Sequence, residues 1–324
     1  MRQIMYREAL REAMTEEMKK DDLLFMIGYD VGKYGGEHRI SGNMFDIFGD
    51  ARVKNAPISE QAIVGCAIGA SITGCRAITE IPFGDFLPMC MDMIVNQAAK
   101  FHYTFGGQMN VPMVILTAMG GYIRAAEQHS QCLEAWFMHV PGLKTVIPST
   151  PYEAKGMMKT AINDPNPVMF IGHKKLLPMK GEVPEEEYTI PFGVADIKKE
   201  GRDVTLIAIS YVVHLALKAA EELEKDGISV EVVDPRSLYP FDKETVLKSV
   251  KKTGRVVIAH EAHVTGGVGA EIAAIIADEA FGYLDSPIKR VGAKWAPIPF
   301  TSVLEDYVLP GIEDIKKAVK EVLE

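Results

Sequence analysis

Hydrophobic and polar residues follow two rhythms along this chain, and the two rhythms alternate. Short apolar runs typical of buried strands, such as residues 23–28 and 204–209, are followed by segments in which apolar residues recur every three or four positions, as in residues 212–225. Strands that alternate with amphipathic helices are typical of parallel α/β sheets. The pattern therefore predicts an α/β fold with parallel or mixed sheets.

The first half of the chain contains five predicted strands and five predicted helices. The helices are expected at residues 4–20, 62–73, 86–101, 130–139 and 152–162, and the strands at 23–28, 76–81, 112–116, 144–147 and 168–171. Residues 30–55 form a polar, glycine-rich excursion, and loops of that length are usually functional.

A second alternation follows a segment rich in Pro, Lys and Glu between residues 172 and 191. Its strands are expected at residues 204–209, 229–233 and 255–259, and its helices at 212–225, 243–251 and 269–280, with further helices in the final stretch. The irregular segment is the best candidate for a domain boundary. We therefore expect one domain at residues 1–180, a linker at 181–191 and a second domain at 192–324.

Composition and charge narrow the class of protein. Of the 324 residues, 48% are hydrophobic and 24% are charged, and the formal net charge is −9. An acidic chain is a poor partner for nucleic acid, and no apolar run approaches the roughly 18 residues of a membrane span. The four cysteines lack the spacing of a zinc site, so we expect a reduced, cytoplasmic protein.

Two short motifs resemble known sites but lack residues that those sites need. His260 and His263 are three positions apart and follow a predicted strand, whereas a zinc protease needs two histidines four apart on a helix. The stretch 266–269 (GGVG) lacks the third glycine of a dinucleotide fingerprint and the Lys-Ser/Thr of a P-loop. A tight turn from strand to helix is the favoured interpretation.

Glu60 stands at the start of a predicted helix made of small and apolar residues, and it has two interpretations. A carboxylate at this position can simply complement the helix dipole, with Ser59 as a cap. Alternatively, the carboxylate is partly removed from water among Ile58, Ile63 and Val64, and the resulting rise in its pKa equips it for proton transfer.

Two further stretches are candidates for chemistry. Residues 80–86 (EIPFGDF) place Phe83 and Phe86 at the end of a strand, where each could equally be a core residue. Residues 125–131 place His129 just before a predicted helix, where a histidine can cap the helix, fill space or catalyse proton transfer.

The order of several motifs resembles one known family. The motifs lie at residues 58–65 (ISEQAIVG), 80–86 (EIPFGDF), 128–137 (QHSQCLEAWF), 139–156 (HVPGLKTVIPSTPYEAKG), 161–168 (AINDPNPV), 233–242 (VDPRSLYPFD) and 265–274 (TGGVGAEIAA). The family is the beta subunit of the thiamine-diphosphate-dependent dehydrogenase component of 2-oxoacid dehydrogenase complexes, which includes acetoin dehydrogenase. The resemblance implies a transketolase-like pyrimidine-binding domain followed by a transketolase C-terminal-like domain.

The resemblance also implies roles for four residues. Glu60 would hydrogen-bond the pyrimidine nitrogen of thiamine diphosphate and so help to generate the reactive carbanion of the cofactor. Phe86 would stack on the aminopyrimidine ring, and Ile58 would make an apolar contact to the cofactor. His129 would assist transfer of the acyl group to a lipoyl arm.

The resemblance implies metal ions as well. A potassium ion would be held, mostly by carbonyl oxygens, at Ala161, Ile162, Asp164 and Asn166. Magnesium is held in such enzymes by a Gly-Asp-Gly motif and a downstream Asn, but residues 49–51 (GDA) and 84–86 (GDF) do not match it. We therefore expect an alpha subunit to hold magnesium and the diphosphate, in an alpha2-beta2 heterotetramer that works with a lipoyl-bearing acyltransferase core.

The predicted function is the beta half of a pyruvate or acetoin dehydrogenase, active only with the alpha subunit. The segment 132–136 (CLEAW) favours this over a branched-chain 2-oxoacid dehydrogenase. Two further functions are considered, namely transketolase-like transfer of two-carbon units and a non-catalytic role in assembly. Transfer of two-carbon units would need several basic residues for sugar phosphates, and residues 122–127 offer only Arg124.

Overall fold

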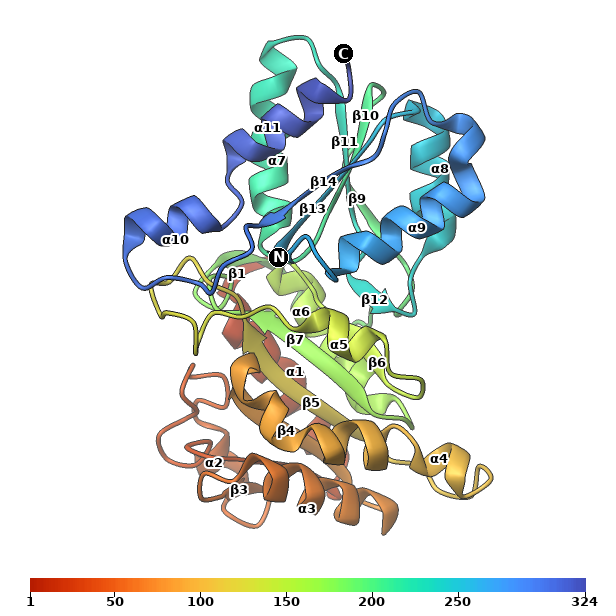
Figure 1. Cartoon of the computed structure of the whole chain (residues 1–324). Helices are drawn as coiled ribbons and strands as arrows, with labels where there is room; N and C mark the ends of the chain where they lie inside the picture. Colours follow the sequence, from red (N-terminus) through yellow and green to blue (C-terminus); the bar gives the residue numbers. More distant parts are fainter. The chain divides into compact units, whose positions relative to one another are not determined.

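The computed structural model describes residues 1–324, and they form two compact α/β units (Figure 1). The first unit comprises Met1–Met119 and Trp136–Phe192, and the second comprises Gly120–Ala135 and Gly193–Glu324. The predicted fold class is confirmed. The segment Gly120–Ala135 lies between two elements of the first unit in the chain, yet it packs with the second.

The first unit is built on a parallel sheet with the strand order β6-β7-β5-β4-β2-β3. Its strands are β2 (Leu24–Gly28), β3 (Val53–Asn55), β4 (Arg76–Phe83), β5 (Met113–Met119), β6 (Lys144–Val146) and β7 (Val168–His173). The central strands β2, β5 and β7 are buried along their whole length, as the continuous apolar runs in the sequence predict.

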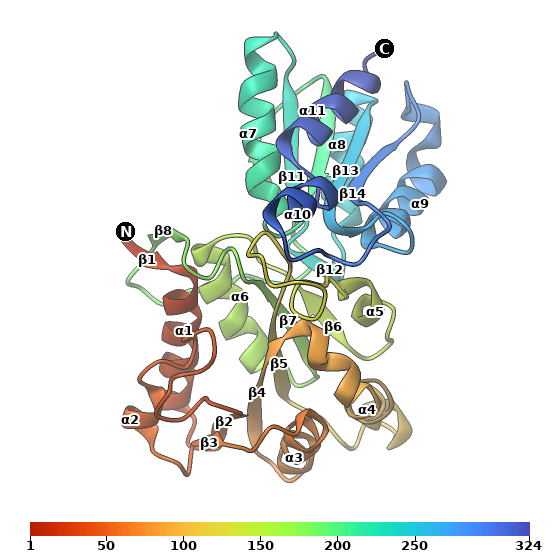
Figure 2. The same cartoon turned by 60° about the vertical axis from the view of Figure 1, so that its left-hand side comes forward.

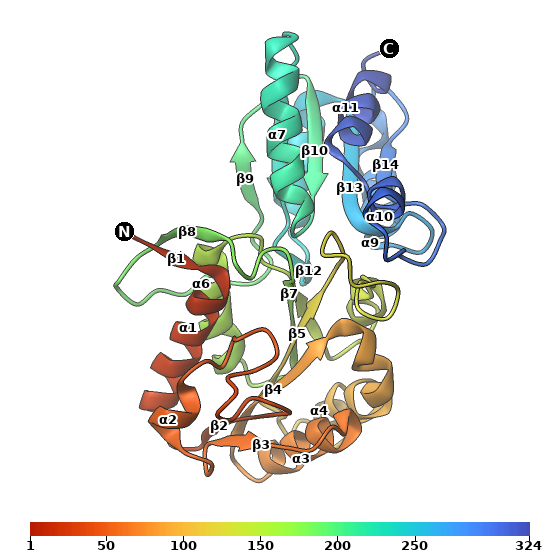
Figure 3. The ribbon, with the colours of Figure 1, turned by 90° about the vertical axis from the view of Figure 1, so that its left-hand side faces the viewer.

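Helices cover both faces of this sheet (Figure 3). On one face α1 (Tyr6–Lys20) and α6 (Pro151–Asn163) pack against each other (Figure 2), and α3 (Glu60–Ile72) covers the other. Lys155 and Lys159 of α6 are buried at this helix pair, and each forms a 2.6 Å ion pair with a glutamate of α1. Removing one partner of such a pair typically costs about 3–5 kcal/mol, because the other charge stays buried.

Two predicted helices of the first half are wrong in extent. The expected helix at residues 86–101 is divided into a 3₁₀ segment η1 (Gly84–Cys90), a π segment η2 (Met93–Ala98) and the short helix α4 (Phe101–Thr104). Pro88 lies inside the first segment and cannot donate a helical hydrogen bond. The helix expected at 130–139 is reduced to α5 (Glu134–Met138).

Two short strands replace expected irregular or helical structure. β1 (Arg2–Met5) pairs antiparallel with β8 (Lys180–Val183), so the chain enters α1 from a strand. A further short helix, α2 (Met44–Phe48), lies within the long excursion. None of these elements shows periodicity long enough to be read from the sequence.

The second unit contains a five-stranded sheet with the order β14-β13-β10-β11-β9. Its strands are β9 (Asp196–Lys199), β10 (Val204–Ala208), β11 (Val230–Asp234), β13 (Val256–His263) and β14 (Lys289–Ala293), and β12 (Ser237–Tyr239) follows β11. Only β9 runs antiparallel to its neighbour. The sheet is therefore mixed, with its antiparallel strand at one edge.

Two pairs of helices enclose this sheet, with α7 (Val212–Lys225) and α11 (Ile312–Glu321) on one face and α8 (Lys243–Thr253) and α9 (Val268–Ala280) on the other (Figure 1). Helix α7 begins and ends at the predicted residues, because its apolar residues recur regularly and pack into the core of the unit. The unit also contains η3 (Phe281–Tyr283) and α10 (Ser302–Val308). No helix of the chain is long and apolar enough to cross a bilayer.

Candidate active site

Glu60 is the first residue of α3, and only 8% of it is exposed. Ser59 precedes it, but the Ser59 hydroxyl donates to the Pro57 carbonyl (3.1 Å) instead of capping the helix. Ile58 is 75% exposed, although it is a large aliphatic residue next to a buried carboxylate. This arrangement places a carboxylate and an apolar surface side by side at the start of a helix.

Two buried residues that the sequence analysis did not single out lie on or next to the neighbouring strands β2 and β4. Tyr29 follows β2, and burial together with the charge of Glu60 raises the pKa of its hydroxyl. Glu80 of β4 is 1% exposed, and neither of its carboxylate oxygens has a hydrogen-bond partner. Burial raises the pKa of Glu80 to about 8, so this carboxyl group holds its proton at neutral pH. A glutamate inside a strand predicted to be buried was the signal in the sequence that could have identified Glu80.

Aromatic side chains extend from the end of β4 into η1. The rings of Phe83 and Phe86 lie edge to face with their centroids 5.5 Å apart, and the His38 ring lies 4.9 Å from that of Phe83. Burial lowers the pKa of His38 to about 4, so this ring is neutral at pH 7. His38 Nε2 is 2.9 Å from the Pro82 carbonyl, which can only accept, so this nitrogen carries the proton.

The first unit brings the helix start and the aromatic segment together. Helix α3 packs against η1, the segment that carries Phe86. The charge of Glu60 also contributes, after burial, to raising the pKa of Cys90 in η1 to about 12. Ile58, Glu60 and Phe86 therefore belong to one region of the first unit.

His129 belongs to the second unit, in a loop of residues 120–131. The Gly120 N–H donates to the Gln131 carbonyl (3.3 Å) and closes the neck of this loop, and the His129 N–H donates to the Ala126 carbonyl (3.4 Å). His129 is half-buried. The three candidate residues Glu60, Phe86 and His129 are thus divided between the two units.

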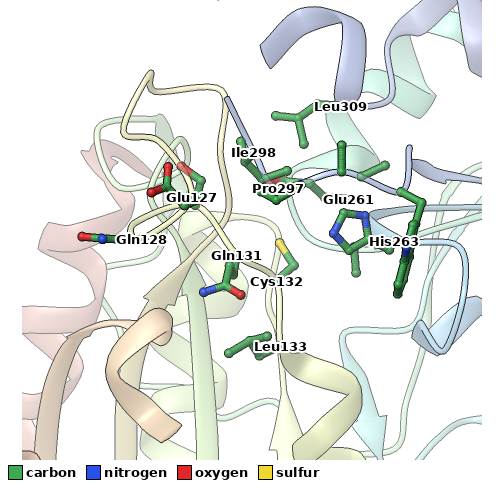
Figure 4. A pocket seen from close by; sticks show the side chains of 15 residues that line it. Glu127, Gln128, Gln131, Cys132, Leu133, Glu261, His263, Pro297, Ile298 and Leu309 are labelled. Carbon is green, nitrogen blue, oxygen red and sulfur yellow. The ribbon is translucent and has the colours of Figure 1, made fainter. Parts of the chain in front are cut away.

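A pocket of about 550 Å³ lies in the second unit beside the His129 loop (Figure 4). Gln131 of the loop lines one side together with the next residues Cys132 and Leu133, and Glu261 and His263 of β13 line the other (Figure 4). Pro297, Ile298, Leu309 and Trp295 complete much of the apolar wall. Its volume and mixed lining are within the range of small-molecule sites.

His260 and His263 do not form a metal site with their neighbours. His260 is fully buried, and a Cβ added to either Gly267 or Gly269 would come within 2.7 Å of its ring. No group of three or more His, Cys, Asp or Glu side chains in the chain is arranged to hold a metal ion. The glycines at 266–269 therefore let the turn into α9 pack closely on a buried imidazole.

The four residues expected to hold potassium already have partners within the chain. Asp164 forms an ion pair with Lys144, and its other oxygen accepts the Asn166 N–H at 2.9 Å. The Ile162 carbonyl accepts a hydrogen bond from the Arg76 guanidinium at 2.9 Å. The Arg76 guanidinium thus bonds to one of the carbonyl oxygens expected to hold potassium, and the Lys144 ammonium pairs with the Asp164 side chain in the same segment.

Comparisons with known proteins match both units to one family. Residues 2–180 match the model of the transketolase pyrimidine-binding domain, and residues 193–315 match that of the transketolase C-terminal domain. The beta subunit of acetoin:2,6-dichlorophenolindophenol oxidoreductase from Bacillus subtilis is 45% identical, over 98% of this chain and 96% of that protein. The chain belongs to the beta-subunit family of thiamine-diphosphate-dependent dehydrogenases. The resemblance stated from the motifs is therefore confirmed.

Beta subunits of enzymes that act on different substrates have similar sequence identities to this chain. The pyruvate dehydrogenase E1 beta subunit of Rickettsia felis is 45% identical, over 99% of this chain and 98% of that protein. The 2-oxoisovalerate dehydrogenase beta subunit of Bacillus subtilis is 42% identical, over 98% of both chains. Among solved structures, a split-gene transketolase described as an inactive beta4 tetramer superimposes with a TM-score of 0.79 at 25% identity, covering 99% of this chain and 98% of that one.

Proposed function

We propose that this chain is the beta half of a thiamine-diphosphate-dependent dehydrogenase that acts on acetoin or pyruvate together with an alpha subunit. The observation that carries the proposal is the placement of Glu60, a nearly buried carboxylate at a helix start, beside the exposed apolar side chain of Ile58. When bound, thiamine diphosphate supplies a carbanion that attacks the carbonyl group of the substrate.

The residues of the first unit fit the pyrimidine end of that cofactor. Glu60 offers a carboxylate that can share a proton with a ring nitrogen. Phe86 offers an aromatic face for stacking, and Ile58 offers an aliphatic surface that a bound ring would remove from water. The hydroxyl of Tyr29 keeps a further proton close to Glu60.

The same chain does not fit the diphosphate end. It lacks a Gly-Asp-Gly sequence, and none of its acidic clusters is arranged to hold magnesium. We therefore assign the diphosphate and magnesium to the alpha subunit, in an alpha2-beta2 heterotetramer with the site shared between the two kinds of chain. The beta-subunit names of the relatives support a partner of this kind.

His129 is proposed to act later, when the acyl group passes to a lipoyl domain of an acyltransferase core. The His129 side chain is half-buried, and an imidazole is the side chain most often used as a general acid or base in such a transfer. We further propose the division of the chain into a pyrimidine-binding domain (1–180), a linker (181–191) and a C-terminal domain (192–324), which the two family matches support.

The potassium ion is the one proposed ligand that the arranged residues fit poorly. Lys144 and Arg76 already bond to Asp164 and to the Ile162 carbonyl. A bound potassium ion would have to share the Ile162 carbonyl with the Arg76 guanidinium and would be repelled by the Lys144 ammonium, so we assign no role to potassium.

Calorimetry tests the shared-site proposal directly. Thiamine diphosphate and MgCl₂ are titrated into the purified chain, into the alpha subunit and into their mixture. We expect strong binding only to the mixture, because this chain offers only the pyrimidine half of the site. Equally tight binding to the chain alone would refute a site divided between two subunits.

A substrate panel tests the proposed activity. The reconstituted pair is supplied with acetoin, pyruvate and 2-oxoisovalerate, with 2,6-dichlorophenolindophenol as the electron acceptor. We expect faster turnover of acetoin or pyruvate. A clear preference for 2-oxoisovalerate would assign the chain to the branched-chain type instead.

A further inference from the structure

Two buried carboxylates from distant parts of the second unit hold the His129 loop. Glu261 of β13 is 6% exposed, and Glu305 of α10 is fully buried. Glu261 accepts the Gly121 N–H, and Glu305 accepts the Arg124 N–H at 3.2 Å and also pairs with the Arg124 guanidinium. Charge-assisted hydrogen bonds of this kind are among the strongest in proteins, and a buried carboxylate without them would be costly.

The backbone of the loop needs such support. Tyr122, Arg124 and Ala126 have φ angles of 60°, 62° and 61°, in the left-handed region that side chains disfavour. Each such residue costs on the order of 1 kcal/mol, and strained residues persist only where their surroundings over-determine them. The Tyr122 hydroxyl adds a further bond to the Pro310 carbonyl at 2.8 Å.

Gly121 allows the loop to approach the carboxylates. A Cβ at this position would lie 2.8 Å from Leu309 Cδ1 and 3.2 Å from Glu305 Oε1. Contacts this short force a shift of the backbone or of its neighbours. An alanine here would therefore displace the Leu309 and Glu305 side chains or the loop itself, and so disturb the contact between the loop and Glu305.

We infer that Glu261, Glu305 and Gly121 are positioning residues that fix the conformation of loop 120–131 and thereby place His129. The hydrogen bond between Gly120 and Gln131 closes the neck of the loop, so a change at residues 121–124 is passed to His129. The consequence for activity rests on the proposed role of His129, whereas the consequence for loop order does not.

Hydrogen exchange read by mass spectrometry on the reconstituted complex tests the loop order. In Glu261→Leu and Gly121→Ala, the amides of residues 120–131 should exchange at least about tenfold faster than in the wild type, because hydrogen bonds to charged groups are lost. Glu261→Gln can still accept from Gly121 and should restore protection. Arg124→Gln alters a side chain that is 37% exposed and provides a variant that should fold if Glu261→Leu does not.

Glu231→Gln is the matched control. Glu231 is a buried carboxylate of the same unit that bonds to Lys252 and the Gly201 N–H, away from the loop. This variant should leave exchange in residues 120–131 unchanged. Wild-type exchange in the loop of both Gly121→Ala and Arg124→Gln would overturn the inference.

A single-turnover assay with a lipoyl domain tests the consequence for activity. Gly121→Ala and His129→Ala should each slow acyl transfer by about 10²-fold, and the double variant should be little slower than either, because both changes remove one function. Unchanged transfer in His129→Ala would remove the proposed role of His129 without affecting the exchange result. Unchanged transfer in Gly121→Ala, with slow transfer in His129→Ala, would overturn the positioning role.

Discussion

The regions around Glu60 and His129 are built in opposite ways. Glu60 begins a regular helix beside a parallel sheet, so two adjacent elements of ordinary geometry determine its position. His129 lies in an irregular loop whose backbone depends on Glu261 and Glu305, more than a hundred residues later in the chain. Local structure thus positions one candidate residue, whereas hydrogen bonds between residues distant in the chain hold the loop that carries the other.

Glu60→Gln should produce the largest effect and tests the locally placed group. Glutamine has nearly the same shape, so folding and assembly should survive, but it cannot share a proton with the pyrimidine nitrogen. Turnover should fall by at least about 10²–10⁴-fold, with cofactor affinity changed far less. Exchange of the thiazolium proton with deuterated water, quenched and read by NMR, is the decisive measurement.

Glu271→Gln is the control for that experiment. Glu271 is an exposed carboxylate in the first turn of α9 in the second unit, where a carboxylate complements the helix dipole. This variant should exchange the thiazolium proton at the wild-type rate. If Glu60→Gln does the same, Glu60 is only a carboxylate that complements its helix.

His129→Ala tests the group placed by tertiary bonds and should have a narrower effect. Transfer to a lipoyl domain should slow by about 10²-fold, whereas turnover with an artificial electron acceptor should change far less. Stopped-flow measurement of both half-reactions separates the two outcomes. Equal loss in both would mean that His129 acts before transfer.

Glu80 offers a test, through stability, of a second buried carboxyl group of the first unit. Burial raises its pKa from 4.5 to about 8, so the folded state binds the proton more tightly than the unfolded state. Stability should therefore fall as pH rises from about 4.5 to 8, by at most roughly 5 kcal/mol. Urea unfolding of Glu80→Gln across this range should show a weaker decline than the wild type.

Glu134 provides the corresponding test of a buried carboxyl group in the second unit. Burial raises its pKa to about 7, with a smaller contribution from the charge of Glu261. Glu134→Gln should therefore weaken the pH dependence only between about 4.5 and 7. The exposed residue Glu186 provides a control, and Glu186→Gln should leave the profile unchanged.

If Glu80→Gln has the same dependence of stability on pH as the wild type, the carboxyl group of Glu80 is ionised in the folded protein.

The smallest expected effect is that of potassium. Because Lys144 already pairs with Asp164, replacing KCl with tetramethylammonium chloride should leave Tm unchanged. Lys144→Met removes the ammonium group that pairs with Asp164, and the Tm of this variant should rise with added KCl. If the Tm of the wild type rises with KCl, potassium binds to the folded protein and the assignment of no role is wrong.

The sequence alone determined what depends on local pattern. The apolar stripe of α7 and the continuous apolar runs of β2 and β10 predict those elements because their periodicity is long and regular. Glu60 was visible because a carboxylate enters a helix of small residues, and the ordered motifs identified the family. These features need no knowledge of which segments meet in space.

Only the tertiary structure decided the features that depend on contacts between distant residues. The expected helix at residues 86–101 is interrupted at Pro88, and the antiparallel pairing of β1 with β8 joins segments almost the length of the first unit apart. Glu80 lies in a mostly apolar strand, but only the folded chain shows that its carboxyl group is buried without a hydrogen-bond partner. The anchoring of residues 121–124 by Glu261 and Glu305 could not be predicted from the sequence, because the two carboxylates lie more than a hundred residues away in the chain from the backbone N–H groups that they bind.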